Sequence, residues 1–299
     1  MIHEDCEPSG NADRKFKCEE YLLFLWRWAV NALIPSSSTP HLDAELLLAA
    51  HLGMTRAQLY GQTPCFVFSS AQQHAIQVAV ERRQRGEPIA YLLGEQEFWS
   101  LTFTVNASVL IPRPETELLV QLLLEKYTHE TIKVADLGTG SGAIAVALAS
   151  ERPAWQLIAT DYCQDALQLA EQNRHRYRLQ NLEWRQGDWC HAFRRRECFD
   201  VIVSNPPYLS PHDPHLHSEL GLRFEPKIAL ISEENGLNHL VTIIRQARHH
   251  LREGGGLFLE HGHEQAAFVC HAFFKFGYHS LQQHKDLSGH LRVTSGKWH

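Results

Sequence analysis

The chain has 299 residues, of which 44% are hydrophobic and 21% are charged, and its formal net charge is -6 at pH 7. This composition is typical of a soluble globular protein with a sizeable core and, at this length, two domains. The acidic balance argues against bare nucleic acid as the main partner, because surfaces that bind nucleic acid carry net positive charge. The cysteines form no C-x-x-C pair, so we expect reduced thiols in a cytoplasmic protein.

The first part of the chain predicts a small helical domain over residues 15–93, preceded by a polar tail over residues 1–14. The apolar stretch 21–34 is short for a membrane span and carries Arg27 in its middle. We therefore interpret it as a core helix and expect no membrane segment. Apolar residues then recur at helical spacing. One expected stripe contains Leu42, Leu46, Ala49 and Ala50, and another contains Ile76 and Val80.

The period of the pattern changes near Gly94. Residues 98–105 are rich in aromatic and β-branched side chains, which predicts a β-hairpin within a linker over residues 94–112. Beyond the linker, strands and helices alternate through a domain over residues 113–299. This alternation predicts a Rossmann-like α/β fold, with a parallel sheet, helices on both faces, and ligands at the carboxyl ends of the strands. The expected strands are 132–137, 156–161, 182–186, 199–204 and 257–260, and the expected helices are 143–150, 164–177, 237–251, 264–276 and one that starts near Glu115.

A glycine-rich loop joins the first of these strands to its helix. Its sequence is Gly138-Thr139-Gly140-Ser141-Gly142. Glycines at alternate positions let the backbone turn sharply and approach a ligand closely. The next strand ends on Asp161, whose carboxylate can accept both hydroxyls of a ribose. The loop alone does not choose the cofactor, because Gly138-x-Gly140-x-x-Ala143 also fits the looser nicotinamide dinucleotide fingerprint.

The third strand is followed by Gly187-Asp188-Trp189. At that position Asp188 can hydrogen-bond an adenine amino group and Trp189 can stack on the adenine ring. The alternative is a surface acid beside a tryptophan that packs under a helix. The sequence leaves both interpretations open.

The turn Asn205-Pro206-Pro207-Tyr208 follows the apolar strand 199–204 at the same edge of the sheet. The two prolines fix φ, so the Pro206 carbonyl lies in a fixed direction beside the side-chain oxygen of Asn205. Two such acceptors can hold both hydrogens of an –NH2 group on an sp2 carbon, while Tyr208 supplies a flat face. The turn therefore predicts methylation of a carboxamide or adenine amino nitrogen by S-adenosylmethionine. Asn205, Pro206 and Tyr208 are the expected catalytic residues, all four bind the substrate, and Asn205 also lies beside the cofactor.

From about Leu42 to the C-terminus the chain resembles the bacterial peptide chain release factor glutamine methyltransferases, also called PrmC or HemK. The matching segments are 42–47, 98–100, 111–117, 136–142, 205–208, 223–226 and 260–262. The resemblance implies N5-methylation of the glutamine in the Gly-Gly-Gln motif of class 1 release factors. It also implies that 138–142, Asp161 and Trp189 bind S-adenosylmethionine, that 205–208 bind the glutamine, and that the helical domain recognises the substrate.

Other substrates present the same –NH2 geometry. Glutamine methylation of a ribosomal protein is the closer alternative, although Pro114-Glu115-Thr116-Glu117 resembles the release-factor branch better. DNA adenine N6-methylation is the more distant one, because such enzymes generally need a basic element to read the duplex and flip the base. A nicotinamide-dependent oxidoreductase would leave 205–208 without a role.

We therefore expect class 1 release factors as partners, no direct contact with nucleic acid, and a monomer. The pairs His215-x-His217 and His261-x-His263 do not predict a metal site, because nothing in the sequence brings them together. The arginine-rich run 194–196 lies outside the family pattern, and we expect it to form a solvated charged face.

Overall fold

The structure, a computed structural model, describes residues 11–61, 69–128 and 131–299, with side chains from residue 21 onward apart from that of His217. The chain divides into two compact units, Met1–Leu93 and Gly94–His299. Helix α1 begins at Asn11, so residues 11–14 are helical, where the sequence predicted a polar tail. The rest of that expected tail lies outside the described residues. Among the residues that the structure describes, no helix is long and apolar enough to cross a membrane.

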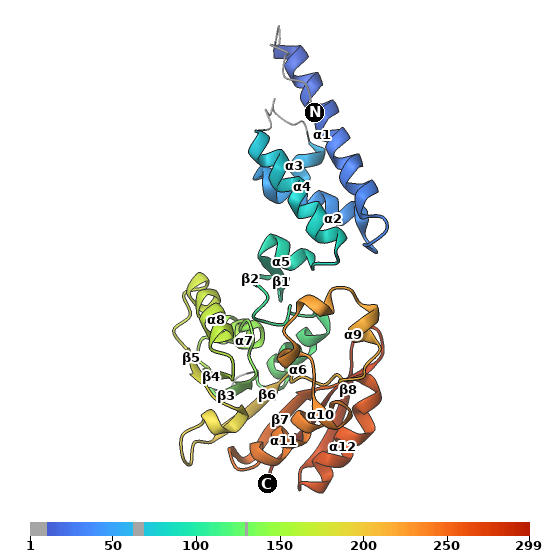
Figure 1. Ribbon diagram of the computed structural model, residues 1–299. Coiled ribbons are helices and arrows are strands. Elements are labelled where there is room, and N and C mark those ends of the chain that lie inside the picture. Colours follow the sequence, from blue (N-terminus) through green and yellow to red (C-terminus); the bar gives the residue numbers. More distant parts are fainter. Residues whose placement is uncertain (1–10, 62–68, 129–130) are drawn as a thin grey trace. The chain divides into compact units, whose positions relative to one another are not determined.

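The first unit is helical, as the sequence predicted (Figure 1). Its helices are α1 (Asn11–Leu33), α2 (Pro40–Leu52), α3 (Arg56–Tyr60), α4 (Ser70–Gln84) and α5 (Ile89–Leu93). The segment 21–34 lies within α1 and its end, and it contributes Leu25, Ala29, Val30 and Leu33 to the core. Ile76 and Val80 of α4 are buried in that core, as expected.

The apolar stripe expected on α2 is wrong as a whole, although Ala49 is buried and Leu46 is half-buried. Leu42 and Ala50 are exposed, whereas Ala44, Leu47, Leu48 and Leu52 are buried. The reason is that α2 contacts both α1 and α4, so its buried face is broader than one helical stripe. This face even includes Asp43 and Glu45, whose carboxylates are paired at 2.7 Å with Arg83 and Arg56. Paired in this way, the two buried acids avoid the cost of an isolated charge.

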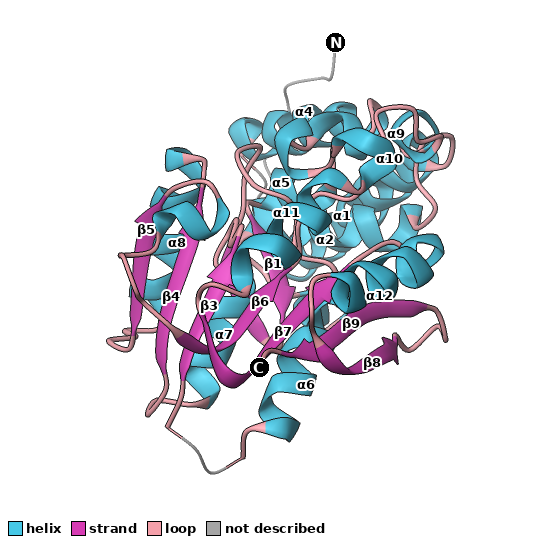
Figure 2. Cartoon of the chain, turned by 90° about the horizontal axis from the view of Figure 1, so that it is seen from below, coloured by secondary structure: helices cyan, strands magenta, loops and turns pink. Residues whose placement is uncertain are grey.

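The second unit contains a seven-stranded sheet with the order β5-β4-β3-β6-β7-β9-β8 (Figure 2). Its strands are β3 (Lys133–Leu137), β4 (Gln156–Asp161), β5 (Leu182–Gln186), β6 (Phe199–Ser204), β7 (Leu251–Glu260), β8 (His279–Lys285) and β9 (Leu291–Lys297). Strands β3 to β7 are parallel, which confirms the Rossmann-like class. The predicted parallel strands are extended by two strands that the sequence did not predict, since β9 runs antiparallel to β7, and β8 to β9. Polar, partly exposed residues of the edge strand β8 hid it from pattern analysis.

Helices cover both faces of this sheet (Figure 2). The helices α6 (Glu117–Lys126), α7 (Ala143–Glu151) and α8 (Gln164–Arg176) form one contacting set, and α11 (Asn238–Ala247) and α12 (Ala266–Lys275) form another. The expected helix 237–251 is shorter than predicted, because β7 already begins at Leu251. Short elements fill the connections: η1 (Pro114–Thr116), η2 (Trp189–Ala192), α9 (His215–Ser218), η3 (Leu222–Phe224), η4 (Lys227–Ala229), α10 (Glu233–Gly236) and η5 (His263–Gln265).

The predicted hairpin is present as β1 (Glu95–Phe98) and β2 (Leu101–Thr104). Its two turn residues, Trp99 and Ser100, have φ values of 53° and 56°, as a two-residue hairpin turn requires. By its contacts the hairpin belongs to the second unit. Asn173 of α8 exchanges hydrogen bonds of 2.8 and 3.1 Å with the backbone of Thr104, and also donates to Ser141 O at 2.8 Å. The hairpin is therefore fastened to the glycine loop through one side chain.

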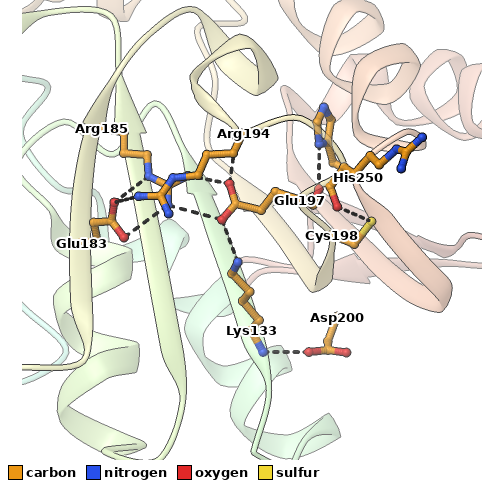
Figure 3. Close-up of polar contacts among 9 residues, drawn as sticks. Lys133, Glu183, Arg185, Arg194, Glu197, Cys198, Asp200 and His250 are labelled. Atoms are coloured by element: carbon orange, nitrogen blue, oxygen red, sulfur yellow. Dashed lines mark hydrogen bonds and ion pairs between the residues drawn. The ribbon is translucent and has the colours of Figure 1, made fainter.

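A cluster of charges holds the loop before β6 (Figure 3). The Glu197 carboxylate accepts hydrogen bonds from Lys133 Nζ at 2.7 Å, Arg185 Nη1 at 2.5 Å and the Arg194 backbone at 3.0 Å. Burial alone would raise the pKa of Glu197, but its bonds from Arg185 and Lys133 lower that pKa to about 2. The run 194–196 itself is exposed, as expected of a solvated face.

Candidate active site

The carboxyl ends of the parallel strands bring the predicted site residues to one edge of the sheet. Gly138 follows β3, Asp161 ends β4, and Asn205 follows β6. Ser204 Oγ donates to the Leu137 carbonyl at 2.7 Å, which fixes the ends of β6 and β3 together. The glycine loop and the Asn-Pro-Pro-Tyr turn, far apart in sequence, therefore leave the sheet side by side.

A cavity of about 330 Å³ opens at this edge. The predicted cofactor residues that line it are Gly138, Thr139, Gly140, Ser141, Asp161, Asp188, Trp189 and Asn205. Gly142 is different, since it caps α7 with φ 83° and does not line the cavity. A Cβ on Gly142 would lie 3.0 Å from the Trp184 ring, so this glycine serves close packing.

The glycine loop presents its backbone to the cavity. Gly138 and Gly140 have φ values of 70° and 56°, in the left-handed region that favours glycine. A Cβ on Gly140 would meet nothing within 4 Å, so this part of the loop faces open space. Beneath the loop, Thr139 donates to Asp136 at 2.6 Å, and burial raises the pKa of Asp136 to about 7.

Asp161 holds the loop in place. Its Oδ2 accepts from the Gly140 backbone at 2.8 Å, and its Oδ1 accepts from the Cys163 backbone at 2.9 Å. Burial raises the pKa of Asp161, and these backbone bonds oppose the shift. Each carboxylate oxygen has a second lone pair, so the group can still accept ribose hydroxyls.

Trp189 forms part of the cavity wall. A Cβ on Gly138 would lie only 3.1 Å from Cζ3 of the Trp189 ring, and the ring centroid is 5.3 Å from that of His239. Trp189 also packs against the core, whereas Asp188 is exposed. Trp189 is thus a packed residue whose ring borders the cavity, and its stacking on adenine stays a prediction.

A second cavity, of about 620 Å³, adjoins the first. Pro206 and Tyr208 line the second cavity, while Asn205 and Pro207 line both. Arg113 also lines both cavities, and Arg292 lines the second. Two of the four predicted substrate residues, Asn205 and Pro207, therefore lie where the two cavities meet, an arrangement that suits a transfer between two bound molecules.

The polar atoms of this turn are held in defined directions. Asn205 Nδ2 donates to Thr116 Oγ1 at 2.9 Å, which leaves Oδ1 on the opposite side of the planar amide. The Tyr208 hydroxyl donates to Glu260 Oε1 at 3.4 Å, and Gln265 Nε2 donates to the Tyr208 carbonyl at 2.9 Å. Burial raises the pKa of Tyr208, so its hydroxyl stays protonated. The Asn205 oxygen is thus not used by Thr116, and its role toward a substrate amide stays a prediction.

Beside the site, hydrogen bonds and an ion pair join three further segments of the family pattern, 98–100, 111–117 and 223–226. The Ile111 backbone donates to the buried Glu225 at 3.0 Å, and the Arg113 guanidinium pairs with the same carboxylate. Glu117 accepts from the Trp99 backbone at 2.7 Å. Arg113 therefore joins segment 111–117 to segment 223–226, and Glu117 joins segment 98–100 to segment 111–117.

Several cavity residues escaped sequence analysis. They are His239, Ile144, Ala166, Ile228, Tyr162 and Cys163. None belongs to a short motif, and His239 reaches the cavity from α11, which follows the site residues in sequence. No sequence motif or spacing of polar residues could therefore have identified them.

One histidine of each pair that predicted no metal site has a hydrogen-bond partner of its own. His215 Nδ1 is 2.7 Å from Asp213, and His261 Nε2 is 2.8 Å from the Thr294 hydroxyl. Within the described ranges, no group of three or more His, Cys, Asp or Glu is arranged to hold a metal ion.

Comparison with known proteins decides the family. Residues 25–94 match the PrmC N-terminal domain, and residues 114–221 match the methyltransferase small domain. The chain is 45% identical to the release factor glutamine methyltransferase of Shewanella oneidensis over 272 residues, 91% of this chain and 94% of that protein. The chain belongs to the release factor glutamine methyltransferase family. The Escherichia coli K12 member is 40% identical over 276 residues, 92% of this chain and 98% of that protein.

Solved structures agree with this family at the level of the fold. The human Mettl16 catalytic domain, in complex with MAT2A 3'UTR hairpin 1, superposes with a TM-score of 0.54 at 15% identity, covering 77% of this chain and 81% of that one. The Thermus thermophilus 16S rRNA N2 G1207 methyltransferase, in complex with AdoMet and guanosine, gives 0.52 at 19% identity, covering 69% and 50%. The family is one of methyltransferases, so the oxidoreductase alternative is wrong.

Proposed function

We propose that this protein methylates N5 of the glutamine side chain in the Gly-Gly-Gln motif of class 1 peptide chain release factors, with S-adenosylmethionine as methyl donor. One observation carries the proposal. Asn205 lies at the junction of two cavities, and its bond to Thr116 directs its side-chain oxygen away from Thr116. A methyl donor in one cavity and an amide in the other would meet at this residue.

The first cavity suits S-adenosylmethionine chemically. Gly140 leaves its backbone open to a ligand, Asp161 offers carboxylate oxygens to ribose hydroxyls, and Trp189 offers a ring to the adenine. Asp188 is the nearby acceptor for an adenine amino group. The cofactor, when bound, supplies a methyl group on a positively charged sulfur.

The Asn-Pro-Pro-Tyr turn would hold the substrate amide. Asn205 Oδ1 and the Pro206 carbonyl accept its two N–H hydrogens, and the Tyr208 ring lies against its plane. A carboxamide nitrogen is a poor nucleophile, because its lone pair is delocalised. Two acceptors would stabilise the positive charge that develops on the nitrogen as the N–CH3 bond forms and the S–CH3 bond breaks. The methylated nitrogen would then be acidic and would release one proton to water. Alignment of the nitrogen can contribute roughly 7–11 kcal/mol in favourable cases.

The relatives named above are release factor glutamine methyltransferases, which favours release factors over a ribosomal protein or DNA adenine. We also propose that the helical unit recognises the factor, and that the protein works as a cytoplasmic monomer without contacting nucleic acid directly.

Transfer of labelled methyl groups tests this function. The purified protein should label a class 1 release factor, but not a variant of that factor whose Gly-Gly-Gln glutamine is replaced by alanine. Labelling that survives the replacement, or that appears instead on a ribosomal protein or plasmid DNA, would refute it.

A further inference from the structure

A buried carboxyl group lies directly behind the Asn-Pro-Pro-Tyr turn. Glu260 ends β7, the parallel neighbour of β6, and Ser204 pairs in register with the preceding Leu259. Glu260 is only 1% exposed, and it lines neither cavity. Oε2 makes no hydrogen bond within the described part of the chain. An enclosed, unpartnered carboxylate oxygen lowers stability, and such a cost is often kept where the group has a function.

Glu260 faces both residues that set the geometry of the turn. The Tyr208 hydroxyl lies 3.4 Å from Oε1. The Thr116 hydroxyl, which accepts from Asn205, also lies near the carboxyl group and lowers its pKa. Arg292 of β9 attracts the carboxylate, and Glu115 of η1 repels it. The positive charges of Arg113 and Arg292 also lower the pKa of Tyr208, against the effect of its burial.

The direction of the hydrogen bonds among Glu260, Thr116 and Asn205 decides which way the Asn205 amide points. A threonine hydroxyl has one proton to donate. An ionised Glu260 can only accept, so it attracts the Thr116 proton to its own side, and the Thr116 oxygen then accepts from Asn205 Nδ2. A protonated Glu260 can donate to Thr116 instead. The Thr116 proton is then free for Asn205 Oδ1, and the flipped amide would present –NH2 to the substrate.

We propose that Glu260 is a positioning residue that, through Thr116, keeps the Asn205 oxygen directed at the substrate amide. The inference rests on the proposed function, because it assumes an –NH2 substrate at Asn205. It gives the carboxylate form of Glu260 a role that a purely structural carboxyl lacks.

If ionised Glu260 positions Asn205 in this way, turnover depends on pH near neutrality. Burial raises the pKa of Glu260, while Thr116, Arg292 and Tyr208 oppose the shift, and the result is about 7. Turnover should therefore fall as the pH drops below about 7. At saturating cofactor, Asp136, which also titrates near 7 but lies beneath the glycine loop, does not enter this profile.

The test measures kcat and KM for a release factor between about pH 6 and pH 8.5, at saturating S-adenosylmethionine. Glu260→Gln should lower kcat at pH 8 by about tenfold, since it acts through Thr116 rather than on the substrate. It should also abolish the acid decline and leave KM within about twofold. The matched control is Glu253→Gln, an exposed carboxyl group on the same strand, which should keep the wild-type profile.

Variants at Thr116 provide a second test of the same inference. Thr116→Val should lose turnover like Glu260→Gln, Thr116→Ser should restore it, and the double variant should lose no more than Thr116→Val alone, because both residues act through one chain. If Glu260→Gln does not fold, the valine and serine variants decide. An acid decline that persists in Glu260→Gln, additive losses in the double variant, or a serine variant as poor as the valine variant would overturn the inference.

A readout independent of activity is the pH dependence of unfolding. The folded pKa of Glu260 is raised, so its favourable contribution is present below the unfolded value of about 4.3 and is lost as the pH rises through about 7. Glu260→Gln should therefore gain stability relative to wild type above that pH; equal stability at all pH values would contradict the assignment. If the wild type methylates no release factor, the proposed function fails and the inference with it. An active wild type whose profile matches that of Glu260→Gln defeats the inference alone.

Discussion

Asn205 Nδ2 donates to Thr116 Oγ1 at 2.9 Å, although the two residues are 89 positions apart. This bond joins the turn that ends β6 to the short helix η1 that precedes α6. It orients a planar amide whose two ends have opposite hydrogen-bonding character. The bond thus connects two family segments that have no evident relationship in sequence.

Replacing Asn205 by alanine should lower kcat by a hundredfold or more, following the usual loss of one preorganised polar partner. The affinity for S-adenosylhomocysteine, measured by calorimetry, should change much less. Asn205→Asp keeps the size but, when ionised, cannot donate to Thr116, and it should also be impaired. Turnover within a few-fold of wild type in either variant would contradict the role of the amide.

Asp161→Ala should raise the dissociation constant of S-adenosylhomocysteine by roughly tenfold to a hundredfold, because hydrogen bonds to a charged group are worth about 1.5–3 kcal/mol. The variant would lose the contact with the ribose and the bonds to the Gly140 and Cys163 backbones. Asp165→Ala, an exposed acid in the first turn of α8, is the control. Equal affinities in the two variants would refute the prediction.

Gly236 supports the substrate turn from behind. Its φ is 83°, and a Cβ would lie 2.0 Å from the Tyr208 carbonyl oxygen. Gly236→Ala should therefore cost about 1–2 kcal/mol of backbone strain and about 1–3 kcal/mol of steric overlap, and should lower kcat. Gly254→Ala has a similar φ, 76°, with nothing within 4 Å, so urea unfolding should show the backbone strain alone. Equal losses of stability would mean that the contact with Tyr208 does not matter.

The Glu197 cluster should make stability depend on acid. Its folded pKa of about 2 lies below the unfolded value of about 4.3, so its contribution is present above pH ~4.3 and is lost as the pH falls toward 2. Glu197→Gln should cost about 2 kcal/mol at pH 7, between the values typical of exposed and buried pairs. The cost should shrink on acidification, as urea titrations at several pH values would reveal. A cost that does not change with pH would contradict this account.

The sequence could predict those parts of the site that depend on backbone conformation. Gly138, Gly140 and the proline pair occupy positions where few other residues fit, and the ends of apolar strands place them at one edge. Contacts between distant side chains leave no such pattern, so only the structure reveals the contacts of Glu260 and the position of His239 in the cavity wall. The same limit explains β8, whose polar residues suit a sheet edge, and α2, whose buried face depends on two neighbours.

The most direct test of the central claim is a mass-spectrometric map of a class 1 release factor purified from cells that lack this protein. The Gly-Gly-Gln glutamine should be unmethylated there. It should regain one methyl group when the wild-type protein is supplied, and remain unmethylated with Asn205→Ala. A methylated glutamine in the cells that lack the protein, or no methylation when the wild type is supplied, would contradict the proposed function.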